Sequence, residues 1–173
     1  MTQGWPSRLQ GRETGARGLP LGAPPAAAAG TLVLDETTHS IRVPGGLLAH
    51  IPEGTHYVDL GGVQAASLQD FGGREEMWRC VTKLYASRCG LTHLDGIGSL
   101  TTVQYLYLDL NRLGAAELRR LCHDLPPGQL RALDLSGNPG LDDAGLLADL
   151  RASGLLRNCE FLNGQRLLEQ SPP

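Results

Sequence analysis

The chain has 173 residues, which is enough for one domain with a modest hydrophobic core. Leucine dominates its apolar residues: 32 Leu accompany only 3 Ile and 2 Phe, which indicates one packing environment repeated many times. The formal net charge of −3 argues against nucleic acid as a main partner, because phosphate binding requires a basic surface. No apolar run approaches the roughly 18 residues of a transmembrane helix, so we expect at most a peripheral membrane contact.

Residues 1–30 are rich in Gly, Pro, Ala and Arg and offer little apolar surface to bury. Arg8, Arg12 and Arg17 stand against Glu13 alone, which gives this arm a net charge of +2. We expect it to be disordered when free. Three interpretations remain open: a mitochondrial targeting segment, an arm that lies along an acidic partner, and a low-complexity extension.

Residues 31–54 are predicted to form an N-terminal cap. The segments 31–34 (TLVL) and 40–43 (SIRV) flank a polar stretch, which is typical of a strand pair. The rest of the chain, 55–173, is predicted to be a repeat domain. Its end, residues 161–170, is expected to form a C-terminal cap in which Leu167 and Leu168 pack on the last unit.

An internal repeat follows the pattern LxxLxLxxNxL, with Asn or Cys at the ninth place. Residues 103–113 (VQYLYLDLNRL) and 130–141 (LRALDLSGNPGL) fit it closely, and residues 81–91 (VTKLYASRCGL) carry Cys at the ninth place. Further units are predicted to start at Thr55 and Leu156. The starts are therefore spaced by 26, 22, 27 and 26 residues. We predict an α/β fold, a short leucine-rich-repeat solenoid of about four to five repeats with a parallel concave sheet.

The spacing has a physical basis. Alternation in a short strand points the fourth and sixth residues inward, and the ninth side chain is suited to bonding backbone groups in the following turn. We expect a 3₁₀-like return segment after Leu91 and helices after Leu113 and Leu141. The residues predicted to hold the repeat together are Leu84, Cys89, Leu106, Leu108, Asn111, Leu133, Leu135, Asn138 and Cys159.

The outward places of the strands define a candidate binding surface. All four tyrosines of the chain fall at third or fifth places of the repeat. Tyrosine with arginine is typical of interface hot spots, although tyrosine also favours strands for its own sake. The predicted partner-binding residues on the concave face are Tyr57, Lys83, Tyr85, Arg88, Tyr105, Tyr107, Asp109, Arg131 and Asp134, and Arg157 and Glu160 are expected to share that surface.

Motifs of catalysis are absent from the sequence. It holds no phosphate loop, no GxGxxG after a strand, no HExxH, no paired CxxC and no GxSxG. Cys122 and His123 are adjacent on a predicted helix, so their side chains do not face each other. We therefore expect a non-enzymatic protein with no cofactor and no metal, whose partners are protein subunits.

The region from about Thr55 to Gly164 resembles a small mitochondrial leucine-rich-repeat family. That family includes ATP synthase subunit s (coupling factor B) and the distal membrane-arm assembly component 2 of complex I. The resemblance rests on LRALDLSGNPGLDDAGLLADLRASGLLRNCEFL with its Asn158-Cys159-Glu160 segment, on VTKLYASRC and on YVDL. It implies a structural or assembly subunit of an inner-membrane respiratory complex or of ATP synthase, on the matrix side.

The step of 22 residues within LTHLDGIGSLTTVQYLYLDLN is similar to the SDS22-like class of leucine-rich repeats. That class includes ciliary and dynein-associated proteins. The resemblance implies an alternative function, that of a cytosolic or axonemal adaptor that uses the same face.

Overall fold

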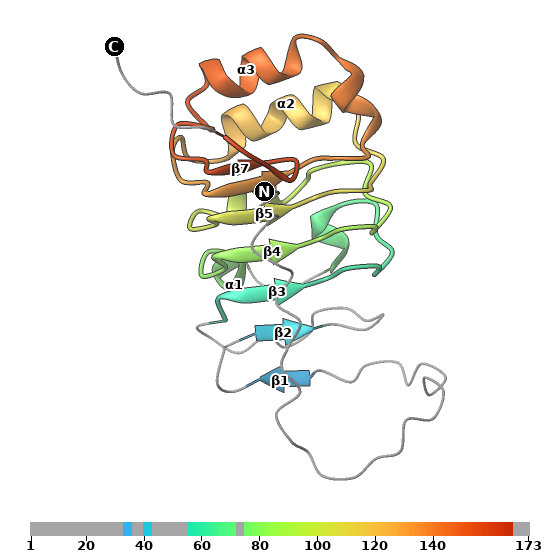
Figure 1. Cartoon of the computed structure of the whole chain (residues 1–173). Helices are drawn as coiled ribbons and strands as arrows, with labels where there is room; N and C mark the ends of the chain where they lie inside the picture. The colour runs from blue at the N-terminus through green and yellow to red at the C-terminus, as the bar shows by residue number, and fades with distance from the viewer. Residues whose placement is uncertain (1–32, 36–39, 43–54, 72–74, 168–173) are drawn as a thin grey trace.

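The computed structural model describes residues 33–35, 40–42, 55–71 and 75–167. The predicted arm over 1–30, most of the predicted cap and Leu168 lie outside these residues. Within them the strands stack one after another in chain order (Figure 1). They are β1 (Val33–Asp35), β2 (Ser40–Arg42), β3 (Tyr57–Asp59), β4 (Lys83–Tyr85), β5 (Tyr105–Tyr107), β6 (Ala132–Asp134), β7 (Phe161–Leu162) and β8 (Gln165–Arg166).

One mixed sheet contains all of these strands. β1 pairs antiparallel with β2, which confirms the predicted strand pair. β2 to β7 are parallel to their neighbours, and β8 turns back antiparallel on β7. Parallel neighbours require a crossover between them, and helical or coil segments supply it here. The α/β class is thus confirmed, and the arrangement is compatible with leucine-rich repeats.

The crossovers differ in length and in helical type. η1 (Leu68–Phe71) and α1 (Glu75–Trp78) join β3 to β4, and η2 (Ile97–Ser99) joins β4 to β5. α2 (Ala115–Asp124) joins β5 to β6, whereas η3 (Pro139–Asp142) and α3 (Leu146–Ala152) join β6 to β7. The predicted 3₁₀ turn after Leu91 and the two predicted helices are confirmed. α3 buries Leu146 and Leu150 but leaves Leu147 39% exposed, so one of its three leucines lies outside the core.

The core lies against one side of the sheet. The middle residue of each central strand points into it, and Val58, Leu84, Leu106 and Leu133 have no exposed surface. Their strand neighbours point to the opposite side because side chains alternate along a strand. The crossovers add the rest of the core, which runs without interruption from Val58 to Leu162. Leu167, beyond β8, packs against this core as predicted for the C-terminal end.

The last unit has a register that differs from the prediction. Phe161 pairs with Ala132, and Leu162 pairs with Leu133. Leu162 therefore takes the buried middle place that was predicted for Cys159, and the unit starts at Cys159 rather than at Leu156. The reason is the length of the crossover. The turn that follows α3 occupies residues 153–158, so β7 cannot begin earlier.

Buried asparagines join successive turns. The Asn111 side chain is 5% exposed, and its Oδ1 accepts hydrogen bonds from the backbone N–H groups of Cys89 (2.9 Å) and Leu91 (3.1 Å) of the preceding unit. Its Nδ2 donates to the carbonyls of Ala86 (2.7 Å) and Leu108 (2.8 Å). One side chain thus satisfies four backbone groups of two units that the sheet itself leaves unpaired.

Asn138 repeats this arrangement one unit later. Its Oδ1 accepts from the Leu113 N–H (3.1 Å), and its Nδ2 donates to the carbonyls of Leu108 (2.9 Å) and Leu135 (2.8 Å). In the earlier unit Cys89 stands at the same place and makes a smaller set, since its Sγ donates to the carbonyl of Leu60 (3.1 Å). The ninth residue of these three units is therefore a bridge to the unit before it.

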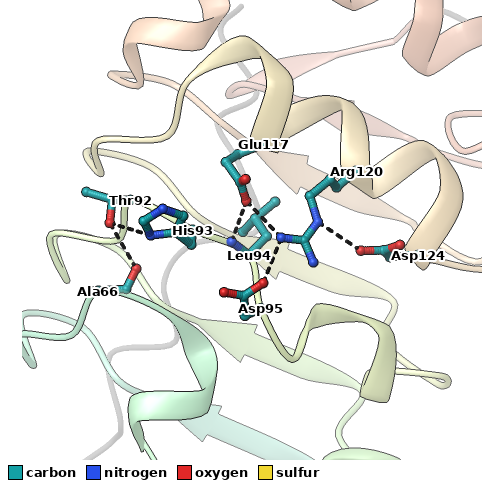
Figure 2. A network of polar contacts seen from close by, with 8 residues as sticks. All are labelled: Ala66, Thr92, His93, Leu94, Asp95, Glu117, Arg120 and Asp124. Carbon is teal, nitrogen blue, oxygen red and sulfur yellow. Dashed lines mark hydrogen bonds and ion pairs between the residues drawn. The ribbon is translucent and has the colours of Figure 1, made fainter.

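Ion pairs connect the crossovers on the other side of the core. Arg120 of α2 reaches back to Asp95 (2.8 Å) and also pairs with Glu117 (3.1 Å) and Asp124 (3.4 Å) of its own helix (Figure 2). Glu117 in turn accepts a hydrogen bond from the Leu94 N–H (2.8 Å). The guanidinium is therefore fixed between the crossover after β4 and the helix after β5.

Arg119, the adjacent residue, points to the following unit. It pairs with Asp143 and Asp149, both at 2.7 Å. The Arg119 guanidinium holds the pKa of the Asp143 carboxyl below its usual value, and the Gly145 N–H helps by donating to the same carboxylate. Asp143 thus accepts a hydrogen bond from Gly145, the residue before α3, and connects α2 to α3 through Arg119. Partly exposed pairs such as these contribute little individually, so they orient the crossovers more than they stabilise them.

Asn111→Ala is expected to lower the free energy of unfolding by at least about 3 kcal/mol, because it leaves several buried backbone groups without a hydrogen-bond partner. Asn158→Ala is the matched control, since its side chain makes one exposed hydrogen bond, to the Gly128 carbonyl. Denaturant unfolding of both variants measures the difference. Equal losses of about 1 kcal/mol would show that Asn111 does not bridge the turns.

Leu106→Ala and Leu133→Ala are each expected to cost about 2–5 kcal/mol, since both side chains are fully buried in the core. Leu147→Ala serves as the control on an exposed leucine. Losses below about 1 kcal/mol for the two strand leucines in urea unfolding would contradict the register described above.

Candidate functional site

The predicted surface residues of the strands lie on the sheet side opposite the core. In the first row, Tyr57 pairs with Lys83 and Lys83 with Tyr105. In the second row, Tyr85 pairs with Tyr107 and Tyr107 with Asp134. We call this surface the tyrosine face, and it comprises Tyr57, Asp59, Lys83, Tyr85, Tyr105, Tyr107, Asp134 and Phe161.

Aromatic contacts organise the tyrosine face. The Tyr85 and Tyr107 rings are stacked, with centroids 4.2 Å apart and an interplanar angle of 5°. Tyr57 continues this cluster, since its ring centroid lies 5.3 Å from that of Tyr85 at an angle of 57°. The Lys83 Nζ stands 4.7 Å from the centroid of the Tyr105 ring, which is a cation–π geometry. All four tyrosines of the chain are thus engaged with another side chain of the same face.

The two central tyrosines are more buried than an open binding face would leave them. Tyr85 is 6% exposed and Tyr107 is 7% exposed, and neither belongs to the leucine core. Burial raises the pKa of the Tyr107 hydroxyl well above its usual value, and its hydrogen bond with Tyr85 adds to the effect. Flat stacking explains part of the burial, because each ring covers a face of the other. The Tyr107 phenol therefore stays protonated at neutral pH.

Carboxylates stand where the strands end. Asp59 Oδ1 accepts from the Gly61 N–H (2.9 Å), and Asp134 Oδ1 accepts from both the N–H (3.0 Å) and the Oγ (2.6 Å) of Ser136. Asp109 Oδ1 accepts a hydrogen bond from the Ser87 Oγ. Short local hydrogen bonds of this kind fix the direction of a side chain at a turn. The carboxylates are therefore held in place beside the tyrosine rings.

The remaining predicted surface residues lie at the margins of the face. Arg88 follows β4 in an exposed turn and has a φ of 59°, a conformation in which side chains are strained. Arg131 precedes β6 and pairs with Glu160 at 3.6 Å. The prediction for Arg157 is wrong: it precedes β7 and lies beside Gly128 and Gly154, away from the strands, because the last unit starts later than predicted.

Two residues of the face were missed from the sequence. Asp59 occupies the fifth place of the first unit, so its position was available from the repeat itself. A unit that starts at Leu156 would place Phe161 at the inward sixth place, but it faces outward because β7 is shifted by three residues. The signal that could have corrected it is the Leu162 that follows, which suits the buried middle place of a strand.

Cys89 and Cys159, which were predicted to hold the repeat together, have thiols of low reactivity. Burial raises the pKa of the Cys89 thiol to about 11 and that of Cys159 to about 11. Each Sγ also donates to a carbonyl, Cys89 to Leu60 and Cys159 to Phe161 (3.0 Å). Thiols of this kind are poor nucleophiles at neutral pH. Within the described residues, no group of three or more His, Cys, Asp or Glu side chains is placed to hold a metal ion.

No family model matches the chain. Part of it is similar to leucine-rich repeat-containing protein 56 of rat and of mouse, with 41% identity in each case over 68 residues, which are 39% of this chain and 11% of the relative. The human protein of that name is 35% identical over 104 residues, 58% of this chain and 17% of the relative. The similarity supports a leucine-rich-repeat family.

The chain therefore spans less than a fifth of the length of the curated relatives it matches. Their names identify leucine-rich repeats, and leucine-rich repeats suggest a role in protein interaction. In the part of the chain that the structure describes, every helix is too short or too polar to cross a membrane.

Alkylation distinguishes the partly exposed cysteines from the buried ones. With a neutral maleimide at pH 7.5, the folded chain is expected to react at the partly exposed Cys80 and Cys122 and to protect the buried Cys89 and Cys159. The sign follows from the pKa, since a thiol of pKa about 11 holds far less thiolate at that pH than an ordinary one. Peptide mass spectrometry measures the sites, and rapid labelling of Cys89 would contradict the geometry.

Proposed function

We propose that this chain is a non-enzymatic protein-interaction scaffold, built as a short leucine-rich-repeat solenoid of about four to five repeats, whose binding surface is the tyrosine face. The observation that carries the proposal is the stacked pair Tyr85–Tyr107, which lies at the centre of the sheet and outside the leucine core. Tyrosine offers a large, rigid contact area with a polar tip, and this combination makes it frequent at interface hot spots.

The separation of the strand residues into an inward and an outward set supports this role. Inward residues fill the core with leucine, and the outward tyrosines stand outside it. The outward side nevertheless carries an aromatic cluster edged by charges rather than the small polar residues of an inert surface. The similarity to leucine-rich-repeat proteins points the same way, because their repeats suggest protein interaction.

The non-enzymatic part rests on how the reactive side chains are used. Cys89 donates to the backbone with a raised pKa, and Asn111 is fully occupied by four backbone bonds. Ser87 bonds Asp109, so its hydroxyl is not paired with a histidine base. These groups serve the fold and leave no assembled catalytic set among them.

We propose further that the scaffold is a structural or assembly subunit of a large complex, with the mitochondrial inner membrane as its place. The resemblance of VTKLYASRC and of the Asn158-Cys159-Glu160 segment to the mitochondrial family supports this, as does the arginine-bearing sequence over 1–30. A second candidate is a cytosolic or axonemal adaptor. The step of 22 residues between Lys83 and its strand partner Tyr105 favours it.

Localisation of the full chain with a C-terminal tag distinguishes the two candidates. Co-localisation with an inner-membrane marker supports the mitochondrial complex, and an axonemal or diffuse cytosolic signal would overturn it. Affinity purification with mass spectrometry then identifies the co-purifying subunits.

Tyr85→Ala combined with Tyr107→Ala is expected to reduce capture of a partner at least tenfold, because it removes the centre of the proposed hot spot. Leu147→Ala with Arg151→Ala, on exposed positions of α3, is the matched control. Pull-down yield from a lysate, with thermal unfolding to verify that both variants are folded, gives the result. An unchanged yield with the folded double-tyrosine variant would refute the tyrosine face as the binding surface.

A further inference from the structure

The turns that follow the central strands share one strained place. The third residue after each of β3, β4, β5 and β6 has a left-handed backbone, with φ of 82° at Gly62, 59° at Arg88, 57° at Leu110 and 70° at Gly137. Glycine adopts this conformation freely, whereas other L-residues are strained in it. The two outer turns therefore carry the residue that suits the backbone, and the two inner turns carry large side chains at a cost to the fold.

Leu110 is exposed as well as strained. It is one of the two large apolar residues that stay exposed in the described part of the chain, and it is 46% exposed. Its buried part lies over Gly137, where a Cβ atom would stand only 2.6 Å from the Leu110 Cδ2. The exposed part adds nothing to the leucine core, to which Leu110 does not belong. Folding alone therefore does not explain a leucine at this turn.

Arg88 and Arg112 are the cationic neighbours of Leu110. The Arg88 N–H donates to the Asp109 carbonyl (3.0 Å), which places Arg88 beside Leu110 on the adjacent turn. Arg112 follows Leu110 by two residues, and both arginines are exposed. Among the described residues, neither guanidinium has an ion pair or a hydrogen-bond partner. We call Arg88, Leu110 and Arg112 the arginine–leucine edge.

Three carboxylates stand near this edge at the ends of the strands. Asp59, Asp109 and Asp134 each accept a hydrogen bond from a residue of the turns. Their charge opposes an incoming anion, so attraction from a distance is weak. An anion is therefore held here only if it pairs directly with a guanidinium and brings an apolar contact for Leu110 with it.

We propose that the arginine–leucine edge binds an acidic segment of a protein partner, in which one large apolar residue lies between two carboxylates. The apolar residue packs on the exposed part of Leu110, and the carboxylates pair with Arg88 and Arg112. Side chains two residues apart point the same way in an extended chain, so the segment reads Glu-x-Leu-x-Glu. This surface goes beyond the proposed function, because none of its three residues belongs to the tyrosine face.

The test uses the full, isotope-labelled chain and a nine-residue Gly/Ser peptide with glutamate at its third and seventh positions and leucine at its fifth. Amide NMR shifts followed through a titration give both Kd and the site of binding. Low ionic strength is used because salt screens exposed ion pairs. We expect saturable shifts at the turns after β4 and β5, and the absence of saturable shifts there would overturn the proposal.

Two control peptides separate the two contributions. One has glutamine in place of both glutamates, and the other has serine in place of the leucine. We expect each control to bind at least fivefold more weakly, because the first cannot form ion pairs with the arginines and the second lacks the apolar contact. Equal binding of either control would overturn the proposal, since the edge would then recognise apolar surface alone or charge alone.

Leu110→Asn removes the apolar contact and keeps a residue that tolerates a left-handed backbone. We expect it to raise Kd at least fivefold without lowering the midpoint of thermal unfolding. Leu147→Asn removes the other exposed leucine and is expected to leave Kd within twofold. A fall in the midpoint larger than that of Leu147→Asn would show that Leu110 serves the fold, and it would overturn the inference.

Arg88→Gln combined with Arg112→Gln tests the ion pairs and is expected to raise Kd at least fivefold. Arg151→Gln with Arg166→Gln is the matched control, since it removes two exposed cations elsewhere with the same change in net charge. We expect this control to leave Kd within twofold. Equal weakening by the two pairs would overturn the proposal and reduce the effect to overall charge.

Discussion

The side-chain amide that bridges two successive turns is the constraint on which the rest of the structure depends. After each strand the backbone leaves the sheet and its N–H and C=O groups lose their strand partners, while the leucines around them exclude water. Asn111 and Asn138 meet this need with both ends of one amide, accepting from the unit before and donating to carbonyls on either side. Each turn is thereby held at a fixed place relative to its neighbour, and the strands that follow remain in register.

That register separates the residues of each strand into an inward set, which fills the core, and an outward set. With Leu84, Leu106 and Leu133 aligned and fully buried, the residues on either side of them must also align, on the opposite side of the sheet. The Tyr85–Tyr107 stack is a direct consequence, because identical places in adjacent strands lie at the spacing of stacked rings. The scaffold thus aligns a row of side chains that lies outside the leucine core. A substitution on that row is expected to affect the proposed binding surface more than the core, whereas a change at a ninth place disturbs the turns that hold the strands in register.

Periodicity sufficed to predict strands β1 to β6, the crossover types after β4, β5 and β6, and the outward positions of the four tyrosines, since each follows from local spacing. It failed at the last unit, because Cys159 and Phe161 match the inward fourth and sixth places of the pattern. Only the length of the α3 crossover shows that Leu162 is the buried residue of the strand. It also missed the depth at which Tyr85 and Tyr107 are buried, because burial depends on contacts between strands that are 22 residues apart. Leu147 illustrates a third limit. The seven-residue helix α3 buries two of its three leucines, and the sequence pattern does not show which of the three stays exposed.

Native-state hydrogen exchange tests the bridging turns most directly. The amides of Cys89, Leu91 and Leu113 donate to Asn111 and Asn138 rather than to a strand or a helix. If these bridges hold the units together, the three amides exchange only when the whole body unfolds, with the same free energy as the buried amides of β4 and β5. Exchange of these three amides at the rate of exposed loops, with the strands still protected, would show that the turns open on their own and would contradict the account.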